Sequence, residues 1–271
     1  MALPPPAVEL PRLKVGGSVD QPGSGWGRRR LPEEVAISLT YDRAAYAVMM
    51  ATPLDLEDFG VGFSLNEGLI GGADALAEIE VVPVELGIEL RMTLAAEASD
   101  RTVERRRRLA GPVGCGLCGV ESLVEALRPL PAVRCTTQID ASEVFAAVAA
   151  LGGAQSLNRE TRAVHAAGFW QPGRGLLAAR EDVGRHNALD KLTGALSRAG
   201  VRPAEGIVVI SSRVSIEMVQ KAAMMGAGIL VAVSAPTALA VRAATESGIT
   251  LVAVARDDGF EVFSAAQRIR T

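Results

Sequence analysis

The sequence predicts an α/β protein, with a three-layer α/β/α domain over residues 137–271 and a smaller N-terminal α+β domain before it. From about residue 137 onward, helical patterns alternate with short apolar strands. Three strand–helix–strand repeats favour right-handed crossovers and a mostly parallel sheet with helices on its faces. Between residues 31 and 110, strand patterns flank one helical pattern. The 271 residues, 49% of them hydrophobic, are enough for one or two globular domains.

The first 30 residues are rich in proline and glycine and end in three consecutive arginines, so we expect a disordered arm and no secretory signal. Residues 31–136 make up the predicted smaller domain, which ends in a loop with a Cys-x-x-Cys motif. Its apolar spacing predicts a hairpin, then a helix, then two more strands. These elements are expected at residues 35–40 with 46–50, 56–68, 79–83 and 87–94.

The second predicted domain, residues 137–271, contains helices that begin at capping residues and several that close at glycines. We expect these helices at residues 140–151, 187–198, 215–226 and 236–248. Its strands are short apolar runs, expected at residues 175–180, 207–211, 229–234 and 250–255, with a last short strand at 260–263. We expect this domain to bind a cofactor.

Charge and cysteine content exclude several classes of function. The formal net charge of −3 does not support non-specific nucleic-acid binding. No charged residue lies between Lys221 and Arg242, but Gly226, Gly228 and Pro236 break this run into buried α/β elements, so we expect no membrane span. Three cysteines are too few for a disulfide framework, which favours a cytoplasmic protein.

Polar clusters follow the carboxyl ends of four predicted strands, at residues 180–182, 211–213, 234–237 and 256–259. They include Arg180, Arg213 and Arg256. Open α/β sheets bind ligands at this edge, so the clusters predict one polar pocket with anion-binding capacity. The alternative interpretation is that they are ordinary caps and turns.

Two cysteines, Cys115 and Cys118, are the strongest candidates for chemistry. Three glycines in the segment Gly-Cys-Gly-Leu-Cys-Gly predict an exposed, flexible turn, and a short helical pattern follows. The amides at the start of that helix favour a thiolate, and four arginines at residues 105–108 would do the same if the chain folds back. Since low-pKa thiolates attack and accept sulfur, we expect one of these cysteines to hand reactive sulfur to a bound nucleotide-type cofactor.

Other interpretations of this cysteine pair compete with a persulfide carrier. A zinc site needs about four ligands, and the chain adds only Cys135, His165 and His186, with neither histidine at finger spacing. A thioredoxin-like pair follows a strand and starts a long helix, which the glycine-dense loop fits poorly. In the simplest interpretation, Cys115 and Cys118 have no shared function. Cys135 lacks such a setting and is expected to be a small buried hydrophobe.

The two histidines differ in their surroundings. His186 is expected at the start of a helix, after a strand end and among five charged neighbours, where it either touches a ligand or serves a structural role. His165 stands next to apolar residues and is more typical of a core histidine with satisfied hydrogen bonds.

Over residues 33–268 the chain resembles the formate dehydrogenase accessory sulfurtransferase family, FdhD. The resemblance rests on the Cys115/Cys118 loop and on four further blocks, at residues 62–70, 181–191, 212–221 and 234–237 leading to 248–251. Together these blocks are specific, whereas the Cys-x-x-Cys alone would be weak. One departure is Arg162-Ala163, where family members often carry Gly-Gly before the histidine.

The resemblance implies a function. Family members take sulfur from a cysteine desulfurase as a persulfide and deliver it to the molybdenum or tungsten of the bis-molybdopterin guanine dinucleotide cofactor, for formate dehydrogenase. Cys115 would carry the persulfide and Cys118 would assist. The implied larger domain is similar to the cytidine deaminase fold, without its zinc set, and the implied assembly is a homodimer. The implied cofactor-binding segment is Val254, Ala255, Arg256, Asp257, Asp258 and Gly259.

Two alternative functions remain open from the residues alone. A zinc-dependent nucleoside deaminase needs a His/Cys-x-Glu pair feeding a Pro-Cys-x-x-Cys loop, but His165 is followed by two alanines and Pro112 stands three residues before Cys115. A non-catalytic molybdenum cofactor chaperone would bind the cofactor without moving sulfur. Retained function without both loop cysteines would favour the chaperone.

Overall fold

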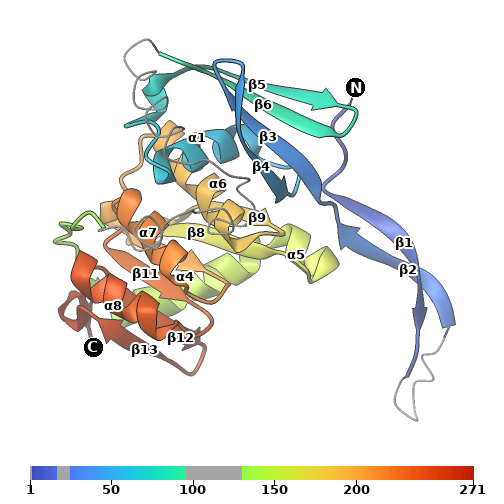
Figure 1. Ribbon diagram of the computed structural model, residues 1–271. Helices are drawn as coiled ribbons and strands as arrows, with labels where there is room; N and C mark the ends of the chain where they lie inside the picture. The colour runs from blue at the N-terminus through green and yellow to red at the C-terminus, as the bar shows by residue number, and fades with distance from the viewer. Residues whose placement is uncertain (1, 17–24, 96–129) are drawn as a thin grey trace.

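The computed structural model describes residues 2–16, 25–95 and 130–271 (Figure 1). Cys115 and Cys118 lie outside the described residues, and so does the arginine run at 105–108. The described part of the chain contains two sheets with their own cores, a small N-terminal unit and a larger C-terminal unit. No helix in the described ranges is long and apolar enough to cross a bilayer.

The N-terminal unit is a four-stranded sheet in the order β4-β3-β6-β5. Strands β3 (Val35–Tyr41) and β4 (Ala44–Ala51) form the predicted hairpin, and β5 (Leu76–Val84) and β6 (Gly87–Leu94) form a second one. The two hairpins join through the parallel pair β3–β6. Helix α1 (Leu56–Asn66) packs on one face, because alternate strand residues such as Leu39 and Leu90 point toward Phe59 and Phe63.

The C-terminal sheet has six strands in the order β13-β12-β11-β10-β8-β9. They are β8 (His165–Gln171), β9 (Gly175–Asp182), β10 (Ile207–Ile210), β11 (Ile229–Ala232), β12 (Thr250–Arg256) and β13 (Gly259–Ser264). Only β10–β11 and β11–β12 pair in parallel, so the predicted mostly parallel sheet is wrong and the sheet is mixed. The sequence analysis missed β8, which inserts antiparallel between β9 and β10 and breaks the parallel order.

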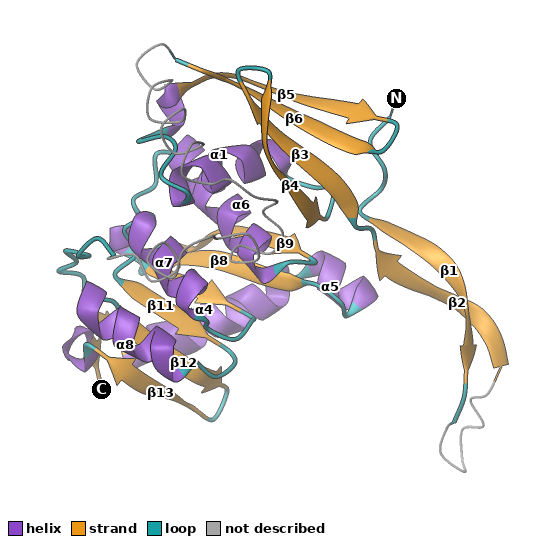
Figure 2. Ribbon diagram, in the orientation of Figure 1, coloured by secondary structure: helices purple, strands orange, loops and turns teal. Residues whose placement is uncertain are grey.

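Helices cover both faces of this sheet, which gives the expected three layers (Figure 2). Helix α4 (Ala141–Ala154) packs against one face, where Ile207 and Val209 point. Helices α6 (Arg185–Arg198), α7 (Ile216–Met224) and α8 (Ala238–Ser247) pack against the other, where Val208 and Ile210 point. The continuous apolar run of β10 therefore reflects burial on both faces.

Short elements complete the larger unit. Helix α5 (Ser156–Thr161) follows α4, and β7 (Ile139–Asp140) pairs in parallel with β14 (Ile269–Arg270) near the end of the chain. Among the described residues, two short 3₁₀ turns of this unit lie at Pro203–Glu205 and Ala266–Arg268, and a third lies at Ala73–Ala75 in the smaller unit.

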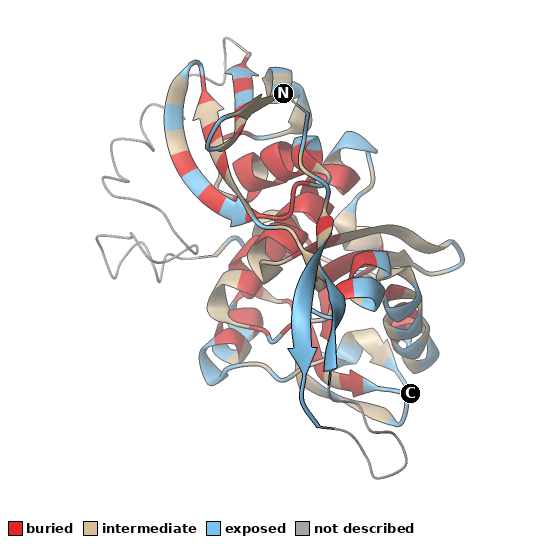
Figure 3. Ribbon diagram, turned by 90° about the vertical axis from the view of Figure 1, so that its right-hand side faces the viewer, coloured by how far each residue is buried: buried red, intermediate tan, exposed pale blue. Residues whose placement is uncertain are grey.

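The N-terminal segment forms a two-stranded ribbon, so the expectation of a disordered arm is wrong for its described residues. Strand β1 (Ala7–Lys14) pairs antiparallel with β2 (Gly25–Pro32) over all eight positions (Figure 3). Regular pairing satisfies backbone groups that the proline and glycine content led us to expect in solvent. The ribbon's root is held by Arg30, which contacts Glu160 at 2.5 Å, and by Arg29, which donates to the Thr161 carbonyl.

Helices α1 and α6 join the two units by a close backbone crossing. A Cβ atom added to Gly62 on α1 would overlap the carbonyl oxygen of Asp190, and one added to Gly194 on α6 would overlap that of Asp58. Only glycine permits this approach. The crossing holds the beginning of α6 beside the small unit, and the candidate site lies at that end of α6.

Candidate functional site

The predicted polar clusters do lie along one edge of the six-stranded sheet. Backbone hydrogen bonds connect its strands in turn at this edge: Ser211 N donates to Ala166 O, Val233 N to Ile210 O, and Val254 N to Ser234 O. His165 opposes Asp182 in the β8–β9 pair at the same end. The carboxyl ends of β9, β10, β11 and β12 and the start of β8 therefore form a continuous edge, where α/β sheets bind ligands.

The cluster at residues 180–182 has a structural role. Its predicted place in the anion pocket is therefore wrong. Arg180 is turned toward the small unit, where its guanidinium donates two hydrogen bonds to one Asp58 oxygen, at 2.7 and 2.9 Å. Glu181 accepts from the backbone amides of Leu157 and Asn158, at the start of α5. Arg180 is therefore not available as a phosphate ligand in this arrangement.

A buried ion pair fixes the start of α6. Lys191 and Asp182 are fully buried, and their Nζ–Oδ2 distance is 2.6 Å. Lys191 also donates to the Thr52 carbonyl, while Asp182 accepts from the Thr52 amide. Residues of both units thus close one network, and it positions the turn between β9 and α6.

A second buried network joins three helices. Lys221 of α7 donates to both oxygens of Asp190 on α6, at 2.7 and 3.0 Å, and Asn66 of α1 donates to the same carboxylate at 2.7 Å. Sequence reasoning did not identify these residues as a network, although all three lie within the blocks that carry the family resemblance. Because all three side chains are buried and bonded to one another, they fix the packing of α1, α6 and α7 against each other.

Two helices begin at the sheet edge with polar side chains whose buried atoms lack partners. Arg185 and His186 open α6, and Ser215 and Glu217 flank the start of α7. Within the described part of the chain, three of their buried atoms make no hydrogen bond: Arg185 Nε, His186 Nε2 and Glu217 Oε2. Because unpartnered buried polar atoms are costly, they mark a place where a polar ligand fits.

The charge states of these groups follow from their surroundings. Burial lowers the pKa of His186 to about 4, with further lowering by Lys221 and Arg185, so the imidazole is neutral at pH 7. Burial and Arg185 also lower the pKa of His165. Burial opposes ionisation of Glu217, but the neighbouring Ser215 hydroxyl, a backbone hydrogen bond and nearby cationic groups prevail and lower its pKa. The cluster thus combines a carboxylate, a guanidinium and neutral imidazoles.

The expected cofactor segment lies at the same edge, at the end of β12. Val254 has a φ of 54°, a left-handed conformation that β-branched residues rarely adopt. The pairing of β12 with β13 shifts register between Ala253 and Arg256, so a bulge sits there. Bulges and strained residues are concentrated next to functional sites, where they redirect side chains. Beyond the bulge, Arg256, Asp257 and Asp258 are exposed.

The two halves of the edge suit a ligand longer than a single ion. Three strand spacings separate the start of β8 from the end of β12, which corresponds to roughly 14 Å at about 4.8 Å each. Arg213 is exposed after β10, between the two halves. The histidine cluster and the Val254 segment therefore stand at the two ends of one sheet edge.

The described ranges contain no group of three or more His, Cys, Asp and Glu side chains placed to hold a metal ion.

Cys135 is half-buried and packs against the core of the larger unit, and its thiol donates to the Ala204 carbonyl at 3.3 Å. Its surroundings are those of the small hydrophobe that the sequence predicts. Sequence reasoning had weighed His186, but it did not single out Glu217 as a site residue.

Comparison with known proteins identifies the chain's relatives. The FdhD/NarQ family model matches residues 32–270. The sulfur carrier protein FdhD of Agrobacterium fabrum is 52% identical over 244 residues, which cover 90% of each chain. The protein of the same name from Bordetella bronchiseptica is 44% identical over 266 residues, covering 97% of this chain and 94% of the relative.

A solved structure has the same architecture. The crystal structure of a formate dehydrogenase accessory protein from Desulfotalea psychrophila superimposes with a TM-score of 0.77 at 25% identity, over 98% of this chain and all of the other. The family match and the full-length relatives agree with the resemblance seen in the motif blocks. The chain belongs to the FdhD/NarQ family.

Proposed function

We propose that this chain is a cytoplasmic sulfurtransferase. It accepts sulfur from a cysteine desulfurase as a persulfide on Cys115, with Cys118 assisting. It delivers that sulfur to the molybdenum of the bis-molybdopterin guanine dinucleotide cofactor that formate dehydrogenase requires. Family membership and the relatives named as sulfur carrier proteins support the sulfur chemistry.

The observation that carries the ligand assignment is the cluster of Arg185, His186 and Glu217 with its unpartnered buried atoms. Guanine and pterin rings share an edge that offers an N–H, an amino group and a carbonyl oxygen. An ionised Glu217 accepts from the first two, and Arg185 donates to the carbonyl or to a phosphate. The donor and acceptor set at this edge therefore fits the heterocycles of the proposed cofactor.

The Val254 to Gly259 segment is the proposed second contact. Arg256 is exposed at its centre, and an arginine binds phosphate oxygens through two parallel N–H groups. The left-handed Val254 and the bulge turn this segment out of the regular ladder. Contacts at both ends of the edge would hold an extended dinucleotide in one orientation.

The sulfur steps balance as ordinary thiol chemistry. The Cys115 thiolate attacks the outer sulfur of the desulfurase persulfide. A new S–S bond forms, the donor S–S bond breaks, and the donor cysteine leaves as a thiolate. Attack of the Cys118 thiolate on the Cys115 sulfur would then release hydrosulfide to the molybdenum and leave a Cys115–Cys118 disulfide. The dithiol supplies the two electrons, and a cellular thiol must reduce the disulfide before the next cycle.

Intact-protein mass spectrometry after incubation with a cysteine desulfurase and cysteine tests the proposal. The wild-type chain should gain the mass of one sulfur, reversibly with a thiol reductant. Cys115→Ala should lose this gain, whereas Cys135→Ala, the matched control at the half-buried cysteine, should keep it. Sulfur loading of Cys115→Ala together with intact support of formate dehydrogenase would refute the proposal.

A double Cys115→Ala/Cys118→Ala variant separates sulfur transfer from mere cofactor escort. We expect it to bind a guanine nucleotide normally but to give inactive formate dehydrogenase. Active formate dehydrogenase from cells that carry only this variant would show that the chain acts as a chaperone. Normal nucleotide binding serves as the control that the variant is folded.

A further inference from the structure

The β1–β2 ribbon is packed only at its root. It forms a sheet of its own, and Ala7 at its base contributes to a small apolar cluster with Leu157 and Val164. Beyond this cluster, residues 9–14 and 25–30 are exposed. In Figure 1 the ribbon extends away from both units. An isolated two-stranded ribbon is marginally stable in water, so its regular pairing favours a surface that covers its exposed part.

The outer half of the ribbon, residues 11–14 with 25–28, is amphipathic. Because side chains alternate along a strand, Leu13 and its opposing residue Trp26 share one face. These two side chains are 52% and 79% exposed. Arg12 and Lys14 lie on the other face, where they oppose two glycines. One face therefore presents apolar side chains, and the other presents two long cations beside a strand that has no side chains opposite them.

Positive charge is concentrated on this ribbon. Its two strands carry five cationic side chains and one acidic one, although the chain has a net charge of −3. Arg29 and Arg30 hold the root. Arg28 is paired with Glu9, but its side chain is 62% exposed, and it lies on the apolar face. Cations around a tryptophan and a leucine are typical of segments that lie in the headgroup layer of anionic membranes.

A headgroup layer meets both faces of such a ribbon, whereas a flat protein surface covers only one. Interfacial segments lie about 5–10 Å deep, at the boundary between headgroups and acyl chains. At this depth the apolar side chains point toward the acyl chains. Long cationic side chains on the opposite face bend toward the surrounding phosphates. The two faces of the ribbon therefore match a fluid anionic layer.

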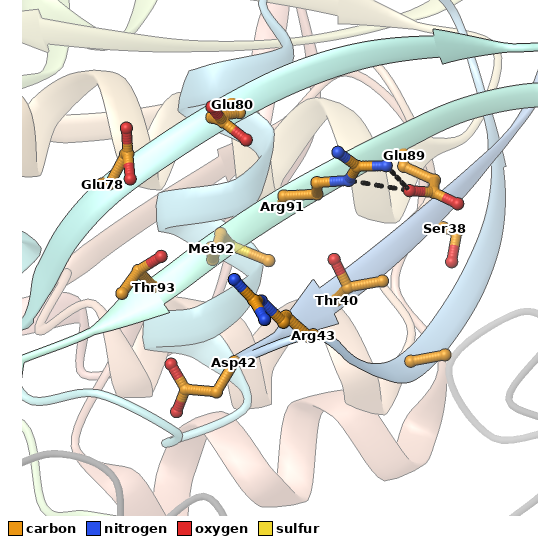
Figure 4. Close-up of a pocket in the computed structure, with 11 residues that line it drawn as sticks. Ser38, Thr40, Asp42, Arg43, Glu78, Glu80, Glu89, Arg91, Met92 and Thr93 are labelled. Carbon is orange, nitrogen blue, oxygen red and sulfur yellow. Dashed lines mark hydrogen bonds and ion pairs between the residues drawn. The ribbon is translucent and has the colours of Figure 1, made fainter.

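The outer face of the small sheet has the opposite charge. It is hollowed into a pocket of about 960 Å³ (Figure 4). Four acidic and two basic side chains line this pocket, namely Asp42, Glu78, Glu80, Glu89, Arg43 and Arg91. An anionic bilayer repels such a face over roughly 8 Å, which is the Debye length at physiological ionic strength. The charge distribution therefore turns the ribbon, and not the small sheet, toward an anionic surface.

We infer that the outer half of the ribbon binds the surface of an anionic lipid bilayer. Leu13 and Trp26 enter the boundary with the acyl chains, and Arg12, Lys14 and Arg28 bind lipid phosphates. The ribbon lies on one leaflet, so this contact is distinct from a membrane span. It uses no residue of the candidate site at the sheet edge.

The fluorescence of Trp26 reports this contact directly. The chain has two tryptophans, and Trp170 belongs to the larger unit, where its Nε1 donates to Glu143. In a full-length Trp170→Phe variant, the emission comes from Trp26 alone. Vesicles of equal parts phosphatidylcholine and phosphatidylglycerol should shift this emission to shorter wavelength, and they should carry the wild-type chain into the pellet on centrifugation. Vesicles of phosphatidylcholine alone should bind at least tenfold more weakly, because they have no net negative charge.

Full-length ribbon variants test which side chains make the contact. In sedimentation with the anionic vesicles, Arg12→Glu/Lys14→Glu and Leu13→Ser/Trp26→Ser should each lower the affinity at least tenfold. The matched control is Arg242→Glu, which reverses an exposed charge on α8 and should leave the affinity within about twofold of the wild type. Melting temperatures equal to that of the wild type show that the variants are folded.

Three results would each overturn the inference. The wild type fails to bind the anionic vesicles, it binds both kinds of vesicle equally, or the charge-reversed ribbon variant binds as tightly as the wild type. A ribbon that serves another protein or a nucleic acid would give the first of these results.

Discussion

His186 shows how burial sets the chemistry of a side chain at the start of α6. Its pKa lies near 4 because burial, Lys221 and Arg185 all disfavour the imidazolium. The unfolded chain binds this proton at an ordinary pKa of 6.5. Between these two values the unfolded state holds more protons than the folded state. Stability therefore falls as the pH falls through this window.

We predict that His186→Gln makes the chain's stability less dependent on pH. Between pH 7 and pH 5 the wild type should lose about 2 kcal/mol more unfolding free energy than the variant, since each pKa unit corresponds to about 1.4 kcal/mol. Carboxylates titrate in both proteins, so the difference between them isolates the histidine. Urea unfolding at the two pH values gives this difference, and parallel slopes would contradict the assignment of a depressed pKa.

Val254 and Arg162 each adopt a left-handed backbone conformation that is unusual for residues other than glycine. Val254 is strained at the end of β12, in the segment proposed to bind the cofactor. Arg162 ends α5 with a φ of 56°, at one of the two positions where family members often carry glycine. The backbone thus keeps a conformation that suits glycine although the residue differs.

The crossing of α1 and α6 depends on the absence of two side chains. Gly62→Ala places a methyl group against the carbonyl of Asp190, and backbone atoms cannot move aside without separating the helices. We predict a loss of about 3 kcal/mol or more in unfolding free energy. The matched control is Gly152→Ala on α4, where nothing lies within 4 Å of the added carbon.

The control should gain up to about 1 kcal/mol, because alanine is the better helix former. Denaturant melts of both variants beside the wild type give the comparison. Equal stability of Gly62→Ala and the wild type would mean that the two helices are not in this close contact in solution.

At the level of elements, the sequence predicted what depends on local pattern. The hairpin at 35–50, α1, and the apolar strands at 207–210 and 229–232 all formed near their predicted positions. Strand β8 was not predicted because Ala166, Ala167 and Gly168 give neither an alternating nor a strongly apolar pattern. Its antiparallel insertion depends on contacts with β10, some 40 residues away, and no local pattern records such pairing.

The sequence predicted those parts of the candidate site that depend on where strands end. The strand-end rule placed residues 211–213, 234–237 and 256–259 on one edge of the sheet, and the backbone hydrogen bonds at the strand ends agree. It failed for Arg180, because the competing carboxylate of Asp58 lies 122 residues earlier in the sequence. Partners that distant cannot be read from spacing. The roles of Cys115 and Cys118 remain a prediction.

The whole molecule is held together by ionic networks that span both units. Asp182 and Lys191 of the larger unit bind the backbone of Thr52 in the smaller one, and the pair is completely buried. Arg180 and Arg198 both donate to Asp58 across the same junction. With α1 and α6 packed at backbone distance, neither unit can unfold without exposing charges of the other. We therefore expect one cooperative transition.

Lys191→Met tests this coupling. It leaves the Asp182 carboxylate buried without its cation, which costs about 3–5 kcal/mol. For a chain of this size, with about 2–4 °C per kcal/mol, the melting temperature should fall by roughly 10 °C or more. Arg270→Met is the control, because it removes only a surface ion pair with Asp140, in which the side chains are 58% and 59% exposed. This variant should change the melting temperature by less than a few degrees.

Calorimetry shows whether the loss of stability in Lys191→Met affects one unfolding transition of the whole chain or the transition of one unit. If the networks couple the units, Lys191→Met moves a single peak to lower temperature, and its calorimetric and van't Hoff enthalpies stay equal. If the units were independent, the variant would show two peaks, of which only one moved. The residues that build these networks lie in the motif blocks at 62–70, 181–191 and 212–221, and they are Asn66, Asp182, Asp190, Lys191 and Lys221. Coupling through them would keep α1, α6 and α7 in one arrangement, and the candidate site is built on the starts of α6 and α7.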